Sequence, residues 1–394
     1  MRTTVLMLVS MLFFVGANDF SADSMAVEAI LSSNSIELQD IHQIIDSANG
    51  RVTGLHLDSR GITVLPQEIS QLDALRLLIL SSNQLSTLPQ EIGSLRQLTQ
   101  LRLENNLLSE LPATFSNLFN LTTLYLNHNE FSEYPDVIYN LRELRELSLT
   151  HNRIDSFSPD SGSMPLLRYL YLDNNVLSTL APQIALLDSL RVLSVRKNDL
   201  ATLPPAIGNL KKLHKLDITG NRISHLPETI GNLLHLQYLH LCENLVTSIP
   251  ASVASLENLR WLYANDNRLP SIPESIQEIT TLELLAVSGN GITRLPQALV
   301  ELPHLMAIDL SHNNLASIPE GIAELKQLTV LFLGHNNLSA LPESITSLVK
   351  LGQIGEVYGS GLDLGANMLC NPSEAVQEWA DSFDPEWRNS QTCR

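Results

Sequence analysis

Two pairs of histidines have a spacing that could place metal ligands side by side. His128 and His151 are 23 residues apart, and so are His312 and His335. If the chain repeats with this period, the members of each pair lie about 5 Å apart, the spacing of neighbouring strands. Structural zinc needs four protein ligands, however, and catalytic zinc usually needs three. We therefore interpret these residues as solvated loop histidines and predict no metal site.

A reactive thiol and a phosphate-binding loop are the other candidates for chemistry. Cys242 lies two residues after His240, and a neighbouring imidazolium can activate a thiol. Residues 358–365, YGSGLDLG, are rich in glycine but neither follow a predicted strand nor open a helix. The chain contains no H-E-x-x-H, P-loop, G-x-S-x-G or dinucleotide fingerprint. We predict that the protein is not an enzyme and uses no cofactor.

The charge balance argues against two classes of partner. The 394 residues include 42 Asp and Glu but only 24 Lys and Arg, which gives a net charge of −18. Nucleic acids and anionic membranes are bound by basic surfaces. We therefore predict no nucleic-acid partner.

The first 17 residues are typical of a secretory signal peptide. Arg2 supplies the positive charge, residues 3–14 form an apolar run too short for a good membrane span, and residues 15–17, V-G-A, suit a cleavage site. We predict a secreted or cell-surface protein, periplasmic or extracellular, with no stable membrane span after cleavage. An uncleaved N-terminal anchor is the alternative.

A 23-residue unit recurs thirteen times between residues 52 and 350. Residues 98–120, LTQLRLENNLLSELPATFSNLFN, represent its pattern, L-x-x-L-x-L-x-x-N-x-L-x-x-L-P-x-x-I/F-x-x-L-x-x. The L-x-L alternation predicts a short strand with one buried side, and the L-P pair ends it. The I-x-x-L spacing predicts a helical or 3-10 turn on the outer side. Because one coil cannot bury its leucines alone, the coils must stack into a solenoid.

An asparagine follows the strand in almost every unit, although the first unit has Arg60 there. Its side chain can bond backbone groups of its own turn and of the next coil, and so satisfy polar groups that the stack buries. The predicted ladder residues are Asn83, Asn106, Asn129, Asn152, Asn175, Asn198, Asn221, Asn244, Asn267, Asn290, Asn313, Asn336 and Asn367.

This unit resembles the leucine-rich repeat, and its LPxxIxxLxxLxxLxLxxN form is similar to the plant intracellular Ras-group subclass, which also occurs in bacteria. The resemblance covers residues 52–350. It implies an α/β repeat solenoid, a horseshoe arc with a parallel sheet on the concave side, short helical or 3-10 turns on the convex side, and helical caps at both ends. Repeat five has Phe157-Ser158 in place of L-P, so we expect its outer wall to be irregular.

Residues 18–51 precede the repeats and are predicted to cap the first coil with two short helices that end at Asn49-Gly50. Their apolar residues recur at helical spacing. These residues are Met25, Ala29 and Ile30 in the first helix, and Ile36, Ile41 and Ile44 or Ile45 in the second.

Residues 351–394 are predicted to form an interrupted fourteenth repeat and a C-terminal cap. The repeat pattern resumes eight residues late, at Leu362. A helix is expected to begin with Asn371 as N-cap. Its Val376, Trp379 and Phe383 would cover the open end of the core. Cys370 and Cys393 bracket this helix and are predicted to form a disulfide; free thiols are the alternative.

The third, fifth, seventh and eighth residues of each unit are expected to line the concave face. Large aromatic and basic side chains gather there in an otherwise acidic protein, and aromatic residues and arginine dominate binding hot spots. Aromatic residues also favour strands, so incidental placement is the alternative. We predict a ligand site over repeats six to ten, and a less adhesive face at both ends, where Ser, Thr, Gly and Ala prevail. The candidate ligand-binding residues are Tyr125, Tyr169, Tyr171, Arg196, Lys197, Lys215, Tyr238, His240, Trp261 and Tyr263.

The favoured hypothesis is a secreted, non-enzymatic recognition module that binds a protein or peptide on its concave face. The first alternative is a glycan-binding or cell-wall-binding protein, in which the same aromatic residues would stack on sugar rings. The second is an intracellular signalling scaffold, which requires that residues 1–17 are not a signal. The sequence leaves the oligomeric state open.

Overall fold

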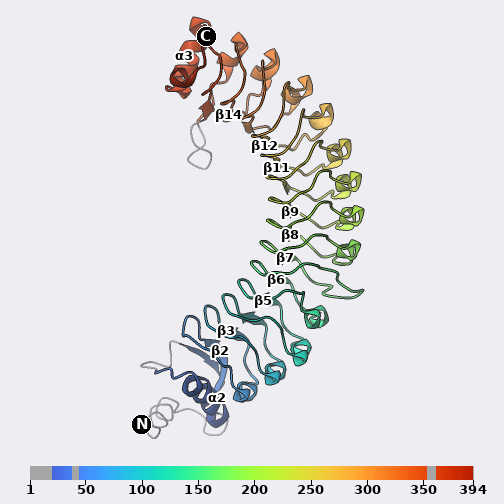
Figure 1. Ribbon diagram of the computed structural model, residues 1–394, viewed down its shortest axis with the longest axis vertical. Coiled ribbons are helices and arrows are strands. Elements are labelled where there is room, and N and C mark those ends of the chain that lie inside the picture. The colour runs from blue at the N-terminus through green and yellow to red at the C-terminus, as the bar shows by residue number, and fades with distance from the viewer. Residues whose placement is uncertain (1–19, 38–43, 353–360, 394) are drawn as a thin grey trace. The chain divides into compact units, whose positions relative to one another are not determined.

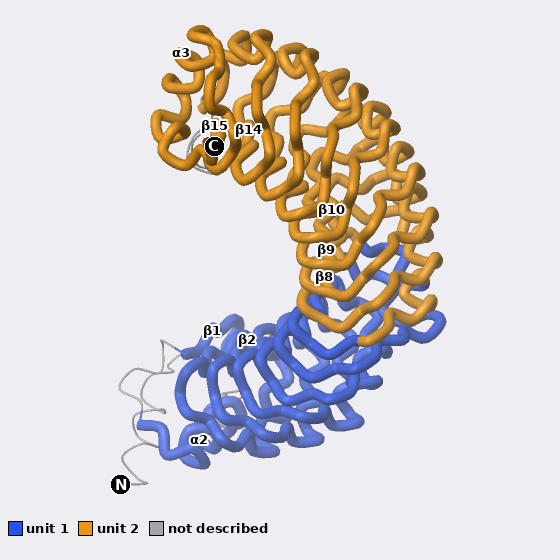
Figure 2. The backbone as a smooth tube through the Cα atoms, turned by 45° about the horizontal axis from the view of Figure 1, so that its top comes forward, with its two compact units in different colours: residues 1–177, 186–190 blue, residues 178–185, 191–394 orange. Residues whose placement is uncertain are grey.

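The computed structural model describes residues 20–37, 44–352 and 361–393 (Figure 1). The predicted signal peptide and residues 353–360, which include the first three residues of the glycine-rich segment 358–365, lie outside this part of the chain. The chain divides into two compact units, residues 1–177 with 186–190 and residues 178–185 with 191–394 (Figure 2). We call them unit 1 and unit 2, and the division runs through the sixth repeat.

Both units are stacks of coils, which confirms the predicted α/β repeat solenoid. In each unit the strands lie on one side of the stack and the 3-10 turns on the other (Figure 1). In unit 2 the strands line the inner side of the curve (Figure 2). We call the surface formed by the third and fifth residues of the repeats the strand face.

Unit 1 begins with helix α2 (Phe20–Ser33). Its strands are β1 (Ile45–Ala48), β2 (Arg51–His56), β3 (Leu77–Ile79), β4 (Gln100–Arg102), β5 (Thr123–Tyr125), β6 (Glu146–Ser148) and β7 (Tyr169–Tyr171). Its 3-10 turns are η2 (Gln67–Gln71), η3 (Gln90–Ser94), η4 (Ala113–Asn117) and η5 (Asp136–Asn140).

Unit 2 contains the remaining strands and ends with the C-terminal cap. The strands are β8 (Val192–Ser194), β9 (Lys215–Asp217), β10 (Tyr238–His240), β11 (Trp261–Tyr263), β12 (Leu284–Ala286), β13 (Ala307–Asp309), β14 (Val330–Phe332) and β15 (Leu362–Asp363). The 3-10 turns are η7 (Pro205–Asn209), η8 (Glu228–Asn232), η9 (Ala251–Ser255), η10 (Glu274–Glu278), η11 (Gln297–Glu301), η12 (Glu320–Glu324) and η13 (Glu343–Ser347), followed by helix α3 (Glu374–Phe383) and η14 (Trp387–Ser390). The turn η6 (Pro182–Leu186) lies across the division between the units.

The repeat strands within each unit pair in parallel, in a register set by the 23-residue period. Leu239 of β10, for example, lies opposite Leu216 of β9 and Leu262 of β11. All three leucines are fully buried. The residues before and after each central leucine point to the opposite side, because successive strand residues alternate. The repeat therefore fixes both the core and the positions that form the strand face.

The ladder asparagines join the coils through backbone groups. Asn106 Nδ2 donates to the carbonyl of Leu103 in its own coil (3.0 Å) and to that of Leu80 in the preceding coil (2.9 Å). Its Oδ1 accepts from the amide of Leu85 (3.0 Å). The asparagine therefore bonds to the preceding coil, whereas the sequence analysis predicted the next coil. The reason is that the Asn follows its own strand and reaches back to the carbonyl that ends the strand before it.

Repeat five has the irregular outer wall that its sequence predicts. No 3-10 turn occurs in the described chain between β6 and β7. Phe157 and Met164, which replace the usual residues, are still buried. The strands are unaffected, because Leu147 of β6 pairs in register with Leu170 of β7.

The N-terminal cap corrects the prediction of two helices. Helix α2 is present, but Ile45–Ala48 form β1, which pairs antiparallel with β2. Ile36 and Ile44 of the predicted second helix lie outside any helix, and residues 38–43 with Ile41 lie outside the described residues. Asn49 and Gly50 both have positive φ, 49° and 76°. Two such residues make a tight hairpin turn, so the Asn-Gly pair joins two strands and does not end a helix.

The C-terminal cap follows the prediction except at the start of its helix. Repeat fourteen resumes at β15, and Cys370 forms a disulfide with Cys393. Helix α3 begins at Glu374, and its N-cap is Ser373, not Asn371. The Ser373 hydroxyl accepts a hydrogen bond from the amide of Val376, which is the bond that defines an N-cap.

Helix α3 covers the last coil through the apolar residues that the sequence indicates. Val376 and Trp379 are buried. The indole Nε1 of Trp379 donates to the carbonyl of Leu348 at 3.1 Å, so its polar atom is also satisfied. Phe383 is half-buried and contacts the Trp379 ring edge-on at 6.0 Å between centroids.

Candidate functional site

The predicted ligand-binding residues fall into two groups, one in each unit. Tyr125 on β5 and Tyr169 and Tyr171 on β7 belong to unit 1. Unit 2 holds the larger group, which consists of Arg196, Lys197, Lys215, Tyr238, His240, Trp261 and Tyr263. The chemistry of the two groups differs.

In unit 1, the tyrosines surround an acidic residue of the same face. The hydroxyl of Tyr125 donates to Glu146 Oε1 at 2.9 Å. The guanidinium of Arg102 lies over the ring of Tyr125, 5.3 Å from its centroid. Burial, with the Glu146 bond adding to it, raises the pKa of Tyr125 to about 12. Burial and the charge of Glu146 also raise the pKa of Tyr171. The hydroxyl of Tyr125 therefore donates its hydrogen bond to a residue of the same unit.

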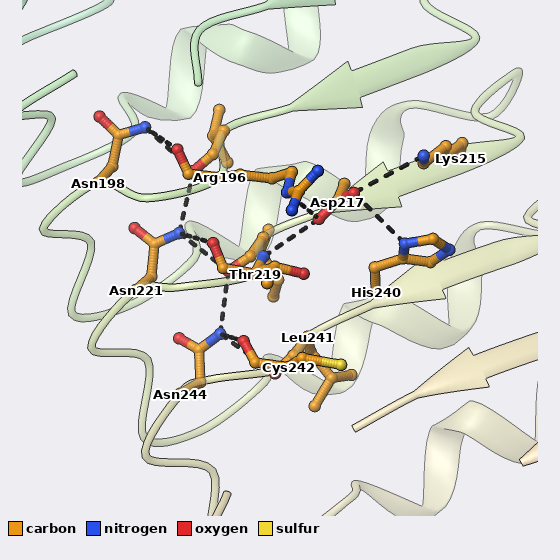
Figure 3. Close-up of polar contacts among 12 residues, drawn as sticks. Arg196, Asn198, Lys215, Asp217, Thr219, Asn221, His240, Leu241, Cys242 and Asn244 are labelled. Atoms are coloured by element: carbon orange, nitrogen blue, oxygen red, sulfur yellow. Dashed lines mark hydrogen bonds and ion pairs between the residues drawn. The ribbon is translucent and has the colours of Figure 1, made fainter. Parts of the chain in front are cut away.

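In unit 2, the side chains of Arg196, Lys215 and His240 converge on one buried carboxylate, Asp217 at the end of β9 (Figure 3). Arg196 Nε lies 3.8 Å from Asp217 Oδ1, and Lys215 Nζ lies 3.7 Å from Oδ2. His240 Nδ1, on the neighbouring strand β10, lies 3.3 Å from Oδ2. The amide of Thr219 donates to Oδ1 at 3.2 Å. We call these residues, Arg196, Lys215, Asp217 and His240, the Asp217 cluster.

The environment of Asp217 favours its charged form. Burial by itself raises the pKa of this carboxyl, since its side chain is only 3% exposed. Hydrogen bonds from His240 and Thr219 outweigh burial, and the pKa lies below its usual value. Arg196 and Lys215 are 47% and 37% exposed. The carboxylate is thus hidden beneath cationic groups that reach solvent.

Aromatic rings follow the Asp217 cluster on the next strands. Tyr238 contacts Trp261 edge-on, with centroids 4.9 Å apart, and His240 contacts Tyr263 edge-on at 4.7 Å. Trp261 and Tyr263 are also perpendicular, at 6.4 Å. Edge-to-face contacts of this kind hold aromatic rings in defined orientations. All four side chains are partly exposed.

Apolar side chains continue over β12 to β14, beyond the predicted limit at repeat ten, but most of them are buried, and Asp309 occupies the fifth position on β13. Trp261, Tyr263 and Phe332 pack against a cluster of small aliphatic side chains at third and fifth positions, namely Leu284, Ala286, Ala307 and Val330. We call Tyr238 with these seven residues the apolar stripe. The lower adhesiveness of this end stays a prediction, because the aliphatic residues there are apolar but only 5–8% exposed.

Lys197 lies apart from the Asp217 cluster. It occupies the exposed turn after β8, and its φ is 49°. The residue before the ladder Asn has this left-handed conformation in most repeats. Lys197 therefore adds positive charge at the rim of the strand face and does not take part in the cluster.

Cys242 does not have the properties of a nucleophile. Burial, with the nearby carboxylates of Asp217, Asp266 and Glu243 adding to it, raises the pKa of its thiol to about 11. The thiolate, which is the reactive form, is therefore scarce at neutral pH.

The histidine pairs stack as their spacing predicts. The rings of His128 and His151 lie 4.1 Å apart in unit 1, and those of His312 and His335 lie 4.0 Å apart in unit 2. Within the described residues, no group of three or more His, Cys, Asp and Glu is arranged to hold a metal ion. The two pairs occupy exposed turns and join no larger cluster.

Sequence reasoning placed Asp217 on the strand face but gave it no role in binding, and it left out the aliphatic half of the apolar stripe. Both sets lie at the third and fifth positions of successive repeats. The third positions of repeats nine to thirteen are all apolar or aromatic, from Tyr238 to Val330. Asp217 is the fifth residue of repeat eight, between a lysine two residues earlier and His240 one repeat later.

Comparisons with known proteins place these features in a family. The family model described as "Leucine-rich repeat region" matches residues 63–161 and 207–288. The model "Leucine rich repeat" matches residues 142–200, 165–223, 280–338 and 303–354. None of the curated proteins compared with the chain matches it.

Solved structures extend the similarity to most of the chain. A leucine-rich repeat protein of Leptospira interrogans is 32% identical, with a TM-score of 0.74; the match covers 83% of this chain and 88% of that one. An internalin, InlF, of Listeria monocytogenes shares the fold at 24% identity and a TM-score of 0.67, covering 84% and 94%. The plant peptide hormone receptor RGFR1, solved in complex with RGF2, is 27% identical with a TM-score of 0.61. That match covers 78% of this chain but only 58% of the receptor.

No helix in the described residues combines the length and the apolar character that a membrane span needs.

Proposed function

Because the chain belongs to the leucine-rich repeat family, we propose that it is a non-enzymatic recognition module that binds an extended segment of a partner protein on the strand face of unit 2. The observation that carries the proposal is the apolar stripe, whose aromatic members are partly exposed and continue into aliphatic side chains. The exposed part of the stripe consists of its aromatic rings, which pack on the buried aliphatic residues, and exposed apolar patches mark interaction sites.

The geometry of the stripe suits an extended ligand. The strands of unit 2 are short and lie side by side, so their third and fifth residues form rows that run across the strands. A segment laid along such a row meets a new side chain about every 4.8 Å. The similarity to a plant receptor solved with its hormone supports a peptide or protein ligand.

We also propose that the protein is secreted or displayed at the cell surface. Residues 1–17 have the pattern of a signal peptide, and the Cys370–Cys393 disulfide fits an oxidising compartment. Fractionation of the source cells, followed by mass spectrometry of the N-terminus, tests this. A reduced cytoplasmic protein that retains residues 1–17 would contradict the proposal.

The binding proposal is tested by selecting peptides from a random dodecapeptide display library on the full chain. The selected peptides are then measured against a variant that carries Tyr238→Ala, Trp261→Ala and Tyr263→Ala. We expect a loss of affinity of at least about 30-fold, since aromatic hot spots each contribute about 2 kcal/mol. A variant with Leu234→Ser serves as the control, because this exposed leucine lies off the strand face.

Circular dichroism and thermal unfolding of both variants show whether the fold is kept. Retained peptide binding by a folded triple variant would contradict the proposal. The glycan alternative is tested by measuring the wild-type protein and the same two variants with soluble polysaccharides. If the wild-type protein binds a polysaccharide more tightly than the selected peptides, a glycan replaces the peptide as the proposed ligand.

A further inference from the structure

We infer that the segment bound by unit 2 carries an acidic group at one end, over the Asp217 cluster, and a bulky apolar side chain at the other, over the apolar stripe. This inference rests on the proposed function and specifies the chemistry and orientation of its ligand.

The first observation is a local excess of positive charge. Residues 191–222 contain seven Lys and Arg but only two Asp, a net charge of +5, whereas the whole chain carries −18. An acidic segment is repelled by most of the protein and attracted to this part. Of these basic residues, Arg196 and Lys215 lie beside Asp217, so charge favours an acidic ligand at β8 and β9.

The second observation is that the Asp217 cluster holds Lys215 at the strand face without a close ion pair. One carboxylate faces both Arg196 and Lys215, so the three residues together keep a net positive charge. Both ion-pair distances, 3.8 and 3.7 Å, are longer than a charge-assisted hydrogen bond. Lys215 Nζ has three donors and lies on the strand face, 37% exposed. A ligand carboxylate can therefore contact Lys215 while Asp217 keeps its position.

The third observation is that His240 connects the two halves of the face. Its Nδ1 faces Asp217 at 3.3 Å, and its ring packs edge-on against Tyr263 at 4.7 Å. The cationic and apolar surfaces therefore meet at β10 without a gap. A single continuous segment can contact both.

The spacing of the strands sets the spacing in the ligand. From β9 to β11 or β12 is two or three strand intervals, about 10 to 14 Å. An extended chain advances about 3.3 Å per residue. The acidic group and the apolar side chain should therefore be three to five residues apart.

The test uses synthetic fluorescein-labelled peptides with a Glu-Glu pair and a Leu-Trp pair separated by one, three, four or eight Gly/Ser residues. Two matched peptides replace Glu-Glu by Lys-Lys or Leu-Trp by Ser-Ser. We expect the peptides with one, three or four spacer residues, each of which can place an acid and an apolar residue three to five residues apart, to bind better at low salt than the peptide with eight. Each matched peptide should bind about 10-fold or more weakly.

Protein variants locate the acidic end. Lys215→Glu should weaken binding of the Glu-Glu peptide about 10-fold and remove its preference over the Lys-Lys peptide. Lys215→Met, which removes the charge without placing an acid beside Asp217, should weaken binding in the same direction. Lys326→Glu is the matched control, because Lys326 is an exposed lysine of unit 2 that lies off the strand face. It should change affinity less than 2-fold.

The inference and the proposed function fail in different ways. Peptides that bind through the aromatic residues but do not distinguish Glu-Glu from Lys-Lys would overturn the inference and leave the proposed function intact. Equal affinity of the wild-type protein and a folded Lys215→Met variant would also overturn it. If neither the synthetic nor the display-selected peptides bind, both ideas are wrong.

Discussion

The strand faces of unit 1 and unit 2 are built from the same repeat but differ in what their aromatic residues contact. In unit 1, the hydroxyl of Tyr125 is bonded to Glu146 of the next strand. In unit 2, Tyr238 and Trp261 contact one another and continue into aliphatic side chains. One acid of the unit 2 face, Asp217, lies below Arg196 and Lys215. The third and fifth residues thus decide the chemistry of a face, whereas the leucines and asparagines that build it stay the same.

The largest expected effect is a loss of stability when a ladder asparagine is removed. The loss should be equal in the two units, because both contain the same ladder. Asn152→Ala in unit 1 removes hydrogen bonds to the carbonyls of Leu126 and Leu149 and to the amide of Phe131. Because these backbone groups are buried, we expect the free energy of unfolding to fall by at least about 3 kcal/mol. Asn267→Ala removes the equivalent bonds in unit 2 and should cost a similar amount.

Chemical denaturation measures both losses. Asn314→Ala is the matched control, because Asn314 is exposed and should change stability by less than about 0.5 kcal/mol. If only one of the two variants loses less than 1 kcal/mol of unfolding free energy, the asparagine ladders of the two units differ. That result would contradict the view that both units share one framework.

A smaller loss of stability is expected when the acid of either strand face is replaced, and it should be larger for Asp217 in unit 2 than for Glu146 in unit 1. Asp217→Asn is expected to cost about 1–3 kcal/mol at pH 7, because the buried carboxylate accepts charge-assisted hydrogen bonds. The pKa of Asp217 is lowered in the folded protein, so the stabilising effect is present above the usual carboxyl pKa of about 3.9 and is lost as the pH falls through the folded value.

The matched substitution in unit 1 is Glu146→Gln. Glu146 is only half-buried. It should cost less than about 1 kcal/mol. Unfolding curves at pH 7 and pH 3 test the pair: the difference between the wild-type protein and Asp217→Asn should shrink at pH 3. A difference that stays constant with pH would show that the charge of Asp217 contributes nothing.

An effect on stability as small as that of Glu146→Gln is expected at its partner, Tyr125. Tyr125→Phe removes one hydrogen bond, so unfolding should become easier by about 0.5–1.5 kcal/mol. In an alkaline ultraviolet titration, the variant should lack one tyrosine that ionises near pH 12. Glu146→Gln should lower the pKa of Tyr125, since the carboxylate disfavours the phenolate. Peptide affinity should change less than 2-fold, and a larger loss would place the ligand on unit 1 as well.

The fold was predictable because its signals are local and repeated. The leucines of the L-x-L pattern, the ladder Asn and the L-P pair recur every 23 residues, so each strand meets its counterpart one period away. The strand at Ile45–Ala48 was missed because its apolar spacing also fits a helix, and only pairing with β2 decides between the two. Ser373 was missed as N-cap because Asn371 and Pro372 also suit a helix start.

The candidate site was only partly predictable. The aromatic residues of β10 and β11 were placed on the strand face from their position in the repeat. Asp217 was not assigned a role, because an acidic residue on an acidic protein is ordinarily solvated. Its importance depends on distances to Arg196, Lys215 and His240, which come from three different repeats.

The sequence by itself determined the period, the strands, the buried leucines, the asparagine ladder and the cysteine pair of the C-terminal cap. These features depend on residue types at fixed spacing, and each coil needs only its neighbours to satisfy them. The tertiary structure alone decided that Asp217 is buried beneath exposed cations and that His240 links this cluster to the ring of Tyr263. The reason is that such contacts depend on the side-chain conformations adopted across adjacent strands, which a repeat pattern does not specify.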